Sequence, residues 1–433
     1  MQKKSRVSFS NNKFAVSSGS IKKELARLNG QVCKTNEEKV ILLKKRDDLI
    51  RKLLELKEKD GNLNSLKTVG LCTSFCSDLE FYERQIQNIV SRYEKDGLSN
   101  ASRNLFVKEY RRPAAGDSTN LPYYIRTEDT LFGATYYLMS SVKEEETKQA
   151  YWYNFMWNRT RAIRKEIFEQ ELVSEKAVIM VEAISRFHIY CRYKLRKLKI
   201  SEFDQKLNDQ GIVECFGSLK RIYRSLGNKT VQYQLNEAEF MSYSLLLQLS
   251  NIPAILQSFS IDPDSLTRGK SLKKLPQLLK FISAYANQNY VLIFDYLKDK
   301  TTFLEMCLCH RYLHSLRKDA LSIIAKAYKG TKLELNFIGE ILKVDKLCDI
   351  IKLAEESGFQ CIGNSMKHTA YSKESNIQIE DDWIDTKQDG DFSAVVLGKN
   401  FIVEDGYDNK KSTFTSAGTY IQDEEIEKYL NCL

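Results

Sequence analysis

The chain has 433 residues, of which 42% are hydrophobic and 28% charged, so it is long enough to bury a large core and to form two or three domains. This is the composition of a globular protein, not of a disordered tail. No uninterrupted apolar run is long enough to span a bilayer, and the first residues lack the apolar core of a secretory signal, so we expect a soluble intracellular protein without membrane insertion.

The net charge of +9 is unevenly distributed along the chain. Residues 1–60 contain 16 Lys and Arg but 8 Asp and Glu, whereas residues 371–433 contain 6 Lys and Arg but 14 Asp and Glu. A basic front and middle favour an anionic partner, either nucleic acid or an acidic protein. The acidic tail would then keep the basic surface selective among such anionic partners.

Residues 1–65 are predicted to form a basic, partly disordered segment that contains one amphipathic helix. Ser, Asn and Lys dominate residues 1–20, which is typical of disorder. From Asn36 to Asp60, leucines recur at helical spacing, at Leu42, Leu49, Leu53 and Leu56. This helix could dock on the body of the protein or pair with another helix, and residues 61–67 are the first expected linker.

The predicted helical body, residues 66–303, begins at a pair of cysteines. Cys72 and Cys76 precede a helix whose start has a capping-box pattern, Ser77 with Glu80, and which is expected to continue to Gly97. Two thiolates alone do not make a structural zinc site. We therefore expect both cysteines to be small buried residues that anchor the loop.

The segment WYNFMWNRTRAIRKE, from Trp152 to Glu166, has the pattern of a helix with one apolar side. Arg159 falls within that side, where a charge is costly unless it is paired, so it is expected to reach a carboxylate or carbonyls of a neighbouring helix. The opposite side carries basic residues that could bind a partner or nucleic acid, or could simply be solvated: Arg161, Arg164 and Lys165.

A second helix, from Ala177 to Leu198, places His188 within its apolar stripe, which favours a hydrogen-bonded core histidine over a metal ligand. Its end and the following segment form a second predicted basic surface for nucleic acid or a partner, made of Arg192, Lys194, Arg196, Lys197, Lys199, Lys220, Arg221 and Arg224. Asn236 and Glu239 have the spacing of a capping box that opens the next helix.

Residues 304–405 are predicted to form a small α+β winged-helix domain. The expected order is a helix to Tyr328, a short strand, helices capped by Asn336 and Asp345, a strand at Phe359–Ile362 and a second wing strand at Val395–Val403. The body before it contains amphipathic helix pairs without a fixed repeat, which indicates an all-α helical-repeat fold, an α-solenoid.

Two acidic segments are expected to be flexible. The insertion between the predicted wing strands, Ser365–Phe392, has a charge that is poorly suited to approach a phosphate backbone. The tail, residues 406–433, is also expected to be disordered.

One group of residues resembles a metal site. Cys307, His310 and His314 share one side of a helix, with Cys309 close by, but their apolar surroundings favour core packing. No nucleophile, pair of carboxylates or glycine-rich phosphate loop gathers elsewhere, so we expect no enzyme activity and no cofactor.

Several motifs in order resemble the SAC/GANP family, the suppressor-of-actin and germinal-centre-associated nuclear proteins. They are the Cys-x-x-x-Cys entry at Cys72 and Cys76, VKEYRRPAA at Val107–Ala115, the segment from Trp157 to Arg164, Arg186–His188, and Asn236–Phe240, which includes Glu237 and Glu239. Together they span about residues 69–360.

The resemblance implies a PCI-like α-solenoid followed by a winged helix, which acts as a scaffold of a nuclear mRNA export complex at the nuclear pore. It also implies pairing with a second PCI-domain protein and a small acidic Sem/DSS-type protein, and a basic surface for RNA. The shorter branch of the family leaves an alternative open, a role in centrosome duplication and spindle function outside the nucleus.

Overall fold

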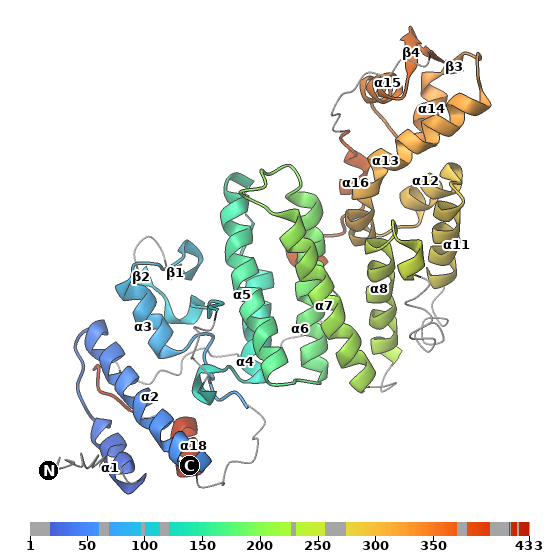
Figure 1. Ribbon diagram of the computed structural model, residues 1–433. Helices are drawn as coiled ribbons and strands as arrows, with labels where there is room; N and C mark the ends of the chain where they lie inside the picture. Colours follow the sequence, from blue (N-terminus) through green and yellow to red (C-terminus); the bar gives the residue numbers. More distant parts are fainter. Residues whose placement is uncertain are drawn as a thin grey trace, which may run out of the picture. The chain divides into compact units, whose positions relative to one another are not determined.

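The computed structural model describes residues 18–59, 69–96, 100–112, 121–144, 146–226, 231–255, 274–369, 379–398, 415, 417–421 and 424–432. This part of the chain is mostly helical, with short antiparallel strands (Figure 1). Each of its helices is too short or too polar to cross a lipid bilayer. The predicted linker at residues 61–67 and most of residues 1–20 lie outside the described residues.

The chain divides into two compact units. The first contains residues 1–134, 161–171 and 404–433, and the second contains residues 135–160 and 172–403. Helices α4 (Glu128–Ser141) and α5 (Gln149–Glu169) contribute residues to both. The first unit also has α1 (Ser18–Leu28), α2 (Asn36–Lys59), α3 (Asp78–Ile86), β1 (Lys95–Asp96), β2 (Asn100–Ala101) and α18 (Glu424–Cys432). The second also has α6 (Glu175–Lys194), α7 (Gln205–Leu226), α8 (Val231–Leu247), α11 (Lys274–Ala286), α12 (Tyr290–Asp299), α13 (Phe303–Ala327), β3 (Leu333–Glu334), α14 (Leu335–Leu342), α15 (Leu347–Glu356), β4 (Phe359–Ile362), β5 (Ser365–His368), α16 (Asp382–Asp385) and α17 (Phe392–Leu397).

The amphipathic helix predicted near the N-terminus is α2. Leu42, Leu49 and Leu53 are buried in a core that α1 and α3 also line. Of the two arrangements left open by the sequence, docking within the chain is therefore the one observed.

Helix α3 is shorter than predicted, because it ends at Ile86. Ile86 and Ile89 are exposed, so the expected apolar side does not extend toward Gly97. Ser77 is the N-cap residue as predicted, but its side chain makes no capping hydrogen bond. The carboxylate of Glu80 instead accepts a hydrogen bond from the backbone N–H of Glu109, so the predicted capping box is wrong.

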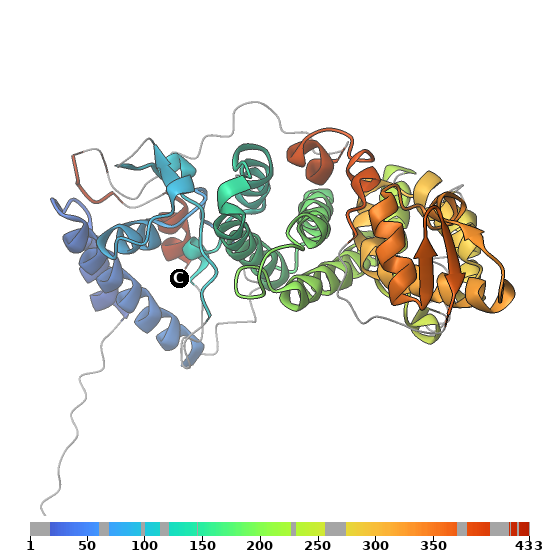
Figure 2. The same cartoon turned by 90° about the horizontal axis from the view of Figure 1, so that it is seen from above.

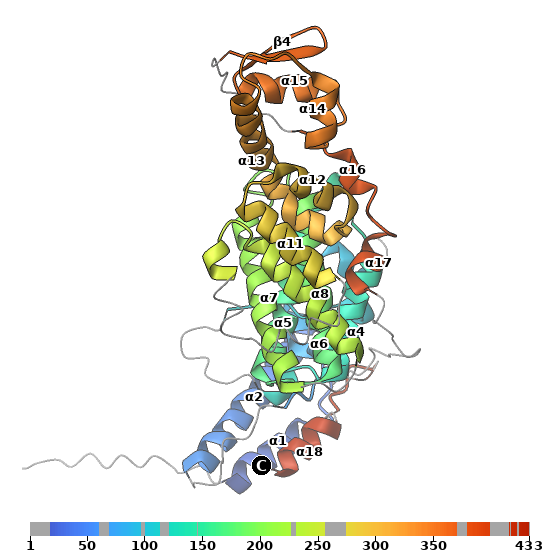
Figure 3. The ribbon, with the colours of Figure 1, turned by 90° about the vertical axis from the view of Figure 1, so that its right-hand side faces the viewer.

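The acidic tail is ordered where the structure describes it, so the prediction of a disordered tail is wrong for this part. Thr419 forms an antiparallel bridge with Val32, and the backbone N–H of Gly30 donates to the carbonyl of Tyr420. Tyr420 and Ile426 are buried in the same core as residues of α1 and α2. Figure 3 shows α18 beside α1. Apolar residues that recur within the acidic sequence cover the N-terminal helices. The charge of the tail sequence does not indicate this packing.

The second unit is built around α6, whose residues are buried on almost every side. Helix α7 packs along α6, and α13 also packs against it (Figure 1). Within this unit, Trp152 of α5 lies against Phe187 of α6, with ring centroids 5.7 Å apart. The apolar stripe predicted for residues 152–167 is confirmed, since Trp152, Phe155, Met156, Ile163 and Ile167 are all buried.

Residues 303–368 of the second unit form a helix, strand, helix, helix, strand, strand sequence, as predicted. Strand β5 lies between β3 and β4 in an antiparallel sheet (Figure 2). In this sheet Cys361 is opposite Met366. The third strand is therefore Ser365–His368, and the prediction of a wing strand at Val395–Val403 is wrong for residues 395–397, which lie in α17. Residues 399–403 of that prediction lie outside the described residues. Gly363, with φ of 61°, allows the tight turn between β4 and β5 that the prediction overlooked.

The helix caps in this region differ from those predicted. Glu334 and Lys346 occupy the N-cap positions of α14 and α15, so Asn336 and Asp345 are not caps. Gly358 does end α15, with φ of 84°. Thr302 forms a complete capping box with Glu305 at the start of α13, where the backbone N–H of Thr302 donates to Oε2 over 2.7 Å.

The C-terminal part of the acidic insertion, residues 379–392, packs on the second unit. Trp383 and Ile384 of α16 are buried. Phe392, at the start of α17, lies 5.1 Å from the ring of Trp152. The expectation of a flexible insertion is thus wrong for these residues, since their apolar side chains join the core.

Candidate nucleic-acid interface

The segment Trp152–Glu166 lies in α5, and we call it the α5 motif. The indole Nε1 of Trp152 donates to the carbonyl of Val142 over 3.2 Å. Arg159 is buried, as predicted, and its guanidinium donates to Asn158 Oδ1 and lies over the Phe155 ring. Trp157 is half-buried. The apolar side of α5 therefore contributes to the core.

The basic side of α5 is less open than the sequence suggests. Arg161 lies over the ring of Tyr110, with its guanidinium carbon 4.0 Å from the centroid, and Lys165 pairs with Glu169 at 3.3 Å. Arg161, Arg164 and Lys165 are all half-buried. Cation–π contact and pairing limit how far these groups can extend toward a phosphate.

The last residue of the motif, Glu166, is buried and binds two cations from the preceding segment. Its Oε2 accepts hydrogen bonds from the backbone N–H and Nε of Arg126, at 2.9 and 3.0 Å, and its Oε1 lies 2.5 Å from Nζ of Lys108. Burial by itself raises the pKa of Glu166, but Arg126 and Lys108 outweigh that effect and hold the pKa below its usual range. Sequence reasoning missed this cluster, although Lys108 belongs to the VKEYRRP motif.

The two cysteines at the start of the body are buried, as predicted. The Cys72 thiol donates to the carbonyl of Ser74 over 3.2 Å, and burial raises the pKa of both Cys72 and Cys76. Desolvation of this kind disfavours the thiolate that a metal requires.

The Arg-Phe-His and Asn-Glu-Ala-Glu-Phe motifs meet in the second unit. Arg186 donates to both carboxylate oxygens of Glu239, at 2.9 and 3.0 Å, and lies 3.4 Å from Glu182. Asn236 donates to Glu182 over 2.9 Å from within α8, which begins at Val231, so the predicted capping box at Asn236 and Glu239 is wrong. Glu237 is half-buried on the same helix.

His188 is a hydrogen-bonded core histidine, as predicted. It is fully buried, and its Nδ1 lies 2.9 Å from Oδ1 of Asn208, while the Asn208 amide donates to the His188 carbonyl. A Cβ on Gly211 would lie 3.0 Å from the imidazole, so a glycine lets α7 approach the ring.

The basic surface predicted at the end of α6 is largely paired with carboxylates. Lys194 lies 2.6 Å from Asp385, Lys197 lies 2.5 Å from Glu380, and Arg192 is buried against Asp209. Lys199 and two residues of α7, Lys220 and Arg224, are exposed, and Arg221 is half-buried. The acidic insertion thus supplies counter-charges to two of the cations that the sequence assigned to nucleic acid, Lys194 and Lys197.

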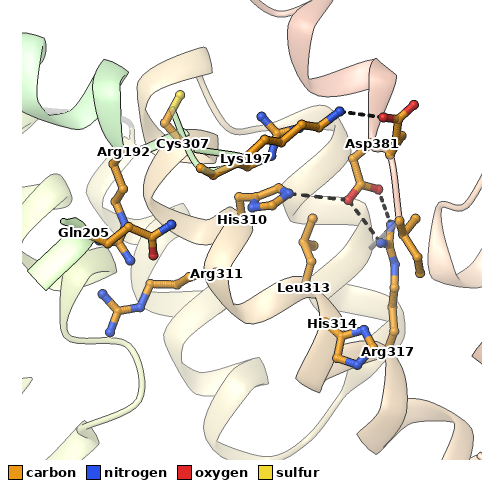
Figure 4. A pocket seen from close by; sticks show the side chains of 13 residues that line it. Arg192, Lys197, Gln205, Cys307, His310, Arg311, Leu313, His314, Arg317 and Asp381 are labelled. Atoms are coloured by element: carbon orange, nitrogen blue, oxygen red, sulfur yellow. Dashed lines mark hydrogen bonds and ion pairs between the residues drawn. The ribbon is translucent and has the colours of Figure 1, made fainter. Parts of the chain in front are cut away.

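This acidic segment is anchored at Asp381. Its carboxylate accepts two hydrogen bonds from Arg317 of α13, at 2.6 and 3.2 Å (Figure 4). It accepts another from the indole of Trp383. Arg317 and Asp381 are 1% and 4% exposed, so this ion pair is part of the core.

Only some residues of the metal-like group on α13 are buried. Cys307 and Cys309 are buried, as predicted, whereas the His314 side chain is 45% exposed and lies 3.7 Å from Glu356. Throughout the described residues, no three metal-binding side chains gather closely enough to hold an ion.

The structure has another basic surface, which was not predicted from the sequence. It is a groove of about 380 Å³ between α13 and β5. We call it the α13 groove, and it is lined by Lys318, Ser322, Ala325, Lys326, Lys329, Ser357 and His368. Lys326 and Lys329 are exposed, and Glu356 is the carboxylate that approaches Lys318, at 3.8 Å. The signal available in the sequence was the spacing of Lys318, Lys326 and Lys329, which places them near one side of a helix.

The charge of the α13 groove suits a phosphate backbone, and two of its lysines, Lys326 and Lys329, are exposed. At the end of α6, Lys194 and Lys197 would first have to give up their contacts with Asp385 and Glu380 to bind a polyanion. The hydroxyl group of Ser322 on the same groove can donate to a phosphate oxygen, whereas that of Ser357 donates to the carbonyl of Leu353.

Comparisons with known proteins identify the family of this chain. Residues 75–363 match the model of the SAC3/GANP family. Protein xmas of Drosophila melanogaster is 32% identical over 355 residues, which cover 78% of this chain and 16% of that protein. SAC3 family protein 1 of Schizosaccharomyces pombe is 28% identical over 60% of this chain and 27% of its own length, and SAC3 family protein B of Arabidopsis thaliana is 27% identical over 66% and 17%. The matched region contains residues 152–166 of α5 and the ion pair between Arg186 and Glu239, and the chain belongs to the SAC3/GANP family.

Proposed function

We propose that this protein is a non-enzymatic scaffold of a nuclear mRNA export complex and that it presents the α13 groove to RNA. Membership of the SAC3/GANP family is the observation that carries the proposal. The matched regions are 27% or less of the length of the three relatives.

The proposed architecture is a PCI-like α-solenoid followed by a winged helix. The order of α13, β3, α14, α15, β4 and β5, with β5 central in the sheet, supports the winged-helix assignment. We further propose a second PCI-domain protein and a small acidic Sem/DSS-type protein as partners. Strand β4 is at the edge of the sheet, and the exposed Ile362 at its end offers apolar area to such a partner.

RNA binding is expected to depend on the α13 groove. Changing Lys326 and Lys329 together to glutamate should weaken binding of a single-stranded RNA oligonucleotide, because two cations that neutralise phosphates are replaced by anions. The slope of log K against log salt should fall by about one for each lysine that contacts a phosphate. Fluorescence anisotropy over a range of salt concentrations measures both quantities.

The matched control is Lys280→Glu, which changes the charge of an exposed residue on α11 outside the groove. Equal losses in the control and in the groove variant would contradict the assignment of the groove. Charge reversal of Arg196 and Lys197 tests the surface that the sequence predicted. A larger loss there than in the groove would move the RNA site to the end of α6.

The cellular role is tested by depletion of the protein. Nuclear poly(A) RNA should accumulate if the chain serves mRNA export, and in situ hybridisation detects it. A normal distribution of poly(A) RNA after depletion would contradict a role in mRNA export. If the purified protein still binds RNA, the assignment of the groove would stand.

A further inference from the structure

A cavity of about 250 Å³ lies within the second unit, between the end of α6, α13 and the acidic segment. Figure 4 shows Arg192, Arg311 and Gln205 on one side of it, Asp381 and Arg317 on the other, and His310 between them. Cys307 and Leu313 form an apolar part of the cavity wall. The cavity is distinct from the α13 groove, because the two share no lining residue.

Cationic groups outnumber carboxylates around this cavity. Five permanently basic side chains line it: Arg192, Arg196, Lys197, Arg311 and Arg317. Three carboxylates contact them, those of Asp209, Glu380 and Asp381. The charges therefore leave an excess of two positive charges facing a space large enough for a small anion.

The excess charge is concentrated at three arginines. Arg192 and Arg311 share the single carboxylate of Asp209, with Arg311 3.6 Å from it. Within the described residues, Arg196 has no carboxylate within ion-pair distance, and it is held by its donation to the Tyr193 carbonyl and by the Tyr193 ring. Planar guanidinium groups held in place in this way match the oxygens of a phosphate.

The electrostatic effect of this arrangement is visible on neighbouring groups. Burial and the charge of Arg311 lower the pKa of Arg192 to about 10. Burial and the charge of Arg196 likewise lower the pKa of His310 to about 4, so the imidazole is neutral at pH 7. A neutral imidazole can still donate one hydrogen bond to a bound anion.

We propose that this cavity binds a small, multiply charged phosphate anion of the inorganic phosphate or pyrophosphate type through Arg192, Arg196 and Arg311. The excess of positive charge attracts such an anion, and the bound anion relieves the repulsion between Arg192 and Arg311. Because the site lies apart from the α13 groove, the inference does not depend on the proposed RNA binding.

Titration of the full-length protein with sodium pyrophosphate tests this inference. Isothermal calorimetry should detect saturable binding, and the Tm should rise relative to sodium chloride at equal ionic strength, because an anion that binds only the folded state stabilises it. Arg196→Gln and Arg311→Gln should each bind about tenfold more weakly, because each removes a charge-assisted hydrogen bond. Both side chains are partly exposed, so neither substitution removes a core residue.

Lys280→Gln is the matched control, and it should bind pyrophosphate as the unmodified protein does. The Lys326→Glu/Lys329→Glu variant should also bind it normally, which separates this test from that of RNA binding. Absence of saturable binding, or equal Tm shifts in all variants, would overturn the inference and would indicate only a general salt effect.

Discussion

Replacing Glu166 by alanine is expected to lower the free energy of unfolding of the first unit by about 3–5 kcal/mol. The carboxylate contacts Lys108 and Arg126, and Arg126 is fully buried. Without Glu166, both cations keep the cost of desolvation and lose the charge that offsets it. Urea denaturation, combined with hydrogen exchange of peptides from residues 106–126, measures the loss and its location.

Glu55→Ala is the matched control, since Glu55 is exposed on α2 of the same unit. It should change stability by less than about 0.5 kcal/mol. A similar small effect of Glu166→Ala would show that the buried cluster does not stabilise the unit.

The Glu166 contribution should also depend on pH in a defined direction. The pKa of Glu166 is lowered on folding, so its contribution is fully present above the unfolded pKa, about 4.5, and is lost as the pH falls through the folded pKa. The difference in Tm between the unmodified protein and Glu166→Gln should therefore be largest near neutral pH and should narrow below about pH 4.5. A difference that widens on acidification would contradict the lowered pKa.

Replacing Asp381 by alanine is expected to destabilise the second unit by about 3 kcal/mol or more. Arg317 would lose two hydrogen bonds from its buried guanidinium, although it still donates to the carbonyls of Leu342 and Lys343. The Trp383 indole would also lose its acceptor. Amide hydrogen exchange should therefore increase across residues 379–398 before the rest of the unit.

Asp382→Ala provides the control, because its side chain is 70% exposed in its pair with Lys346. Exposed ion pairs contribute little, so this variant should change stability by less than about 1 kcal/mol. Equal exchange in the two variants would show that the segment is held by its apolar residues alone.

The helices of this protein were largely predictable because their apolar periodicity is local. Leu42, Leu49 and Leu53 indicated α2, and the spacing of Trp152, Phe155 and Met156 indicated α5. The caps were less predictable. Asn236 has the chemistry of an N-cap, but its amide is used by Glu182 on another helix, which a local pattern cannot show.

The pairing of charges could not be predicted from sequence. Glu380 and Asp385 lie more than 180 positions from Lys197 and Lys194, and nothing near either segment indicates that they meet. The sequence therefore suggested a free basic surface and a flexible acidic insertion. Burial of Trp383 and packing of Phe392 against Trp152 bring the acidic segment to the basic one, and that depends on the whole core.

By itself, the sequence determined the helical class, the family motifs and the buried positions of Cys72 and His188, because each depends on residues close together in the chain. Only the tertiary structure decided which cations are paired, which remain exposed in the α13 groove and which surround a cavity. The physical reason is that the net effect of a charge depends on its solvation and on the charges around it in space, whatever their separation in sequence.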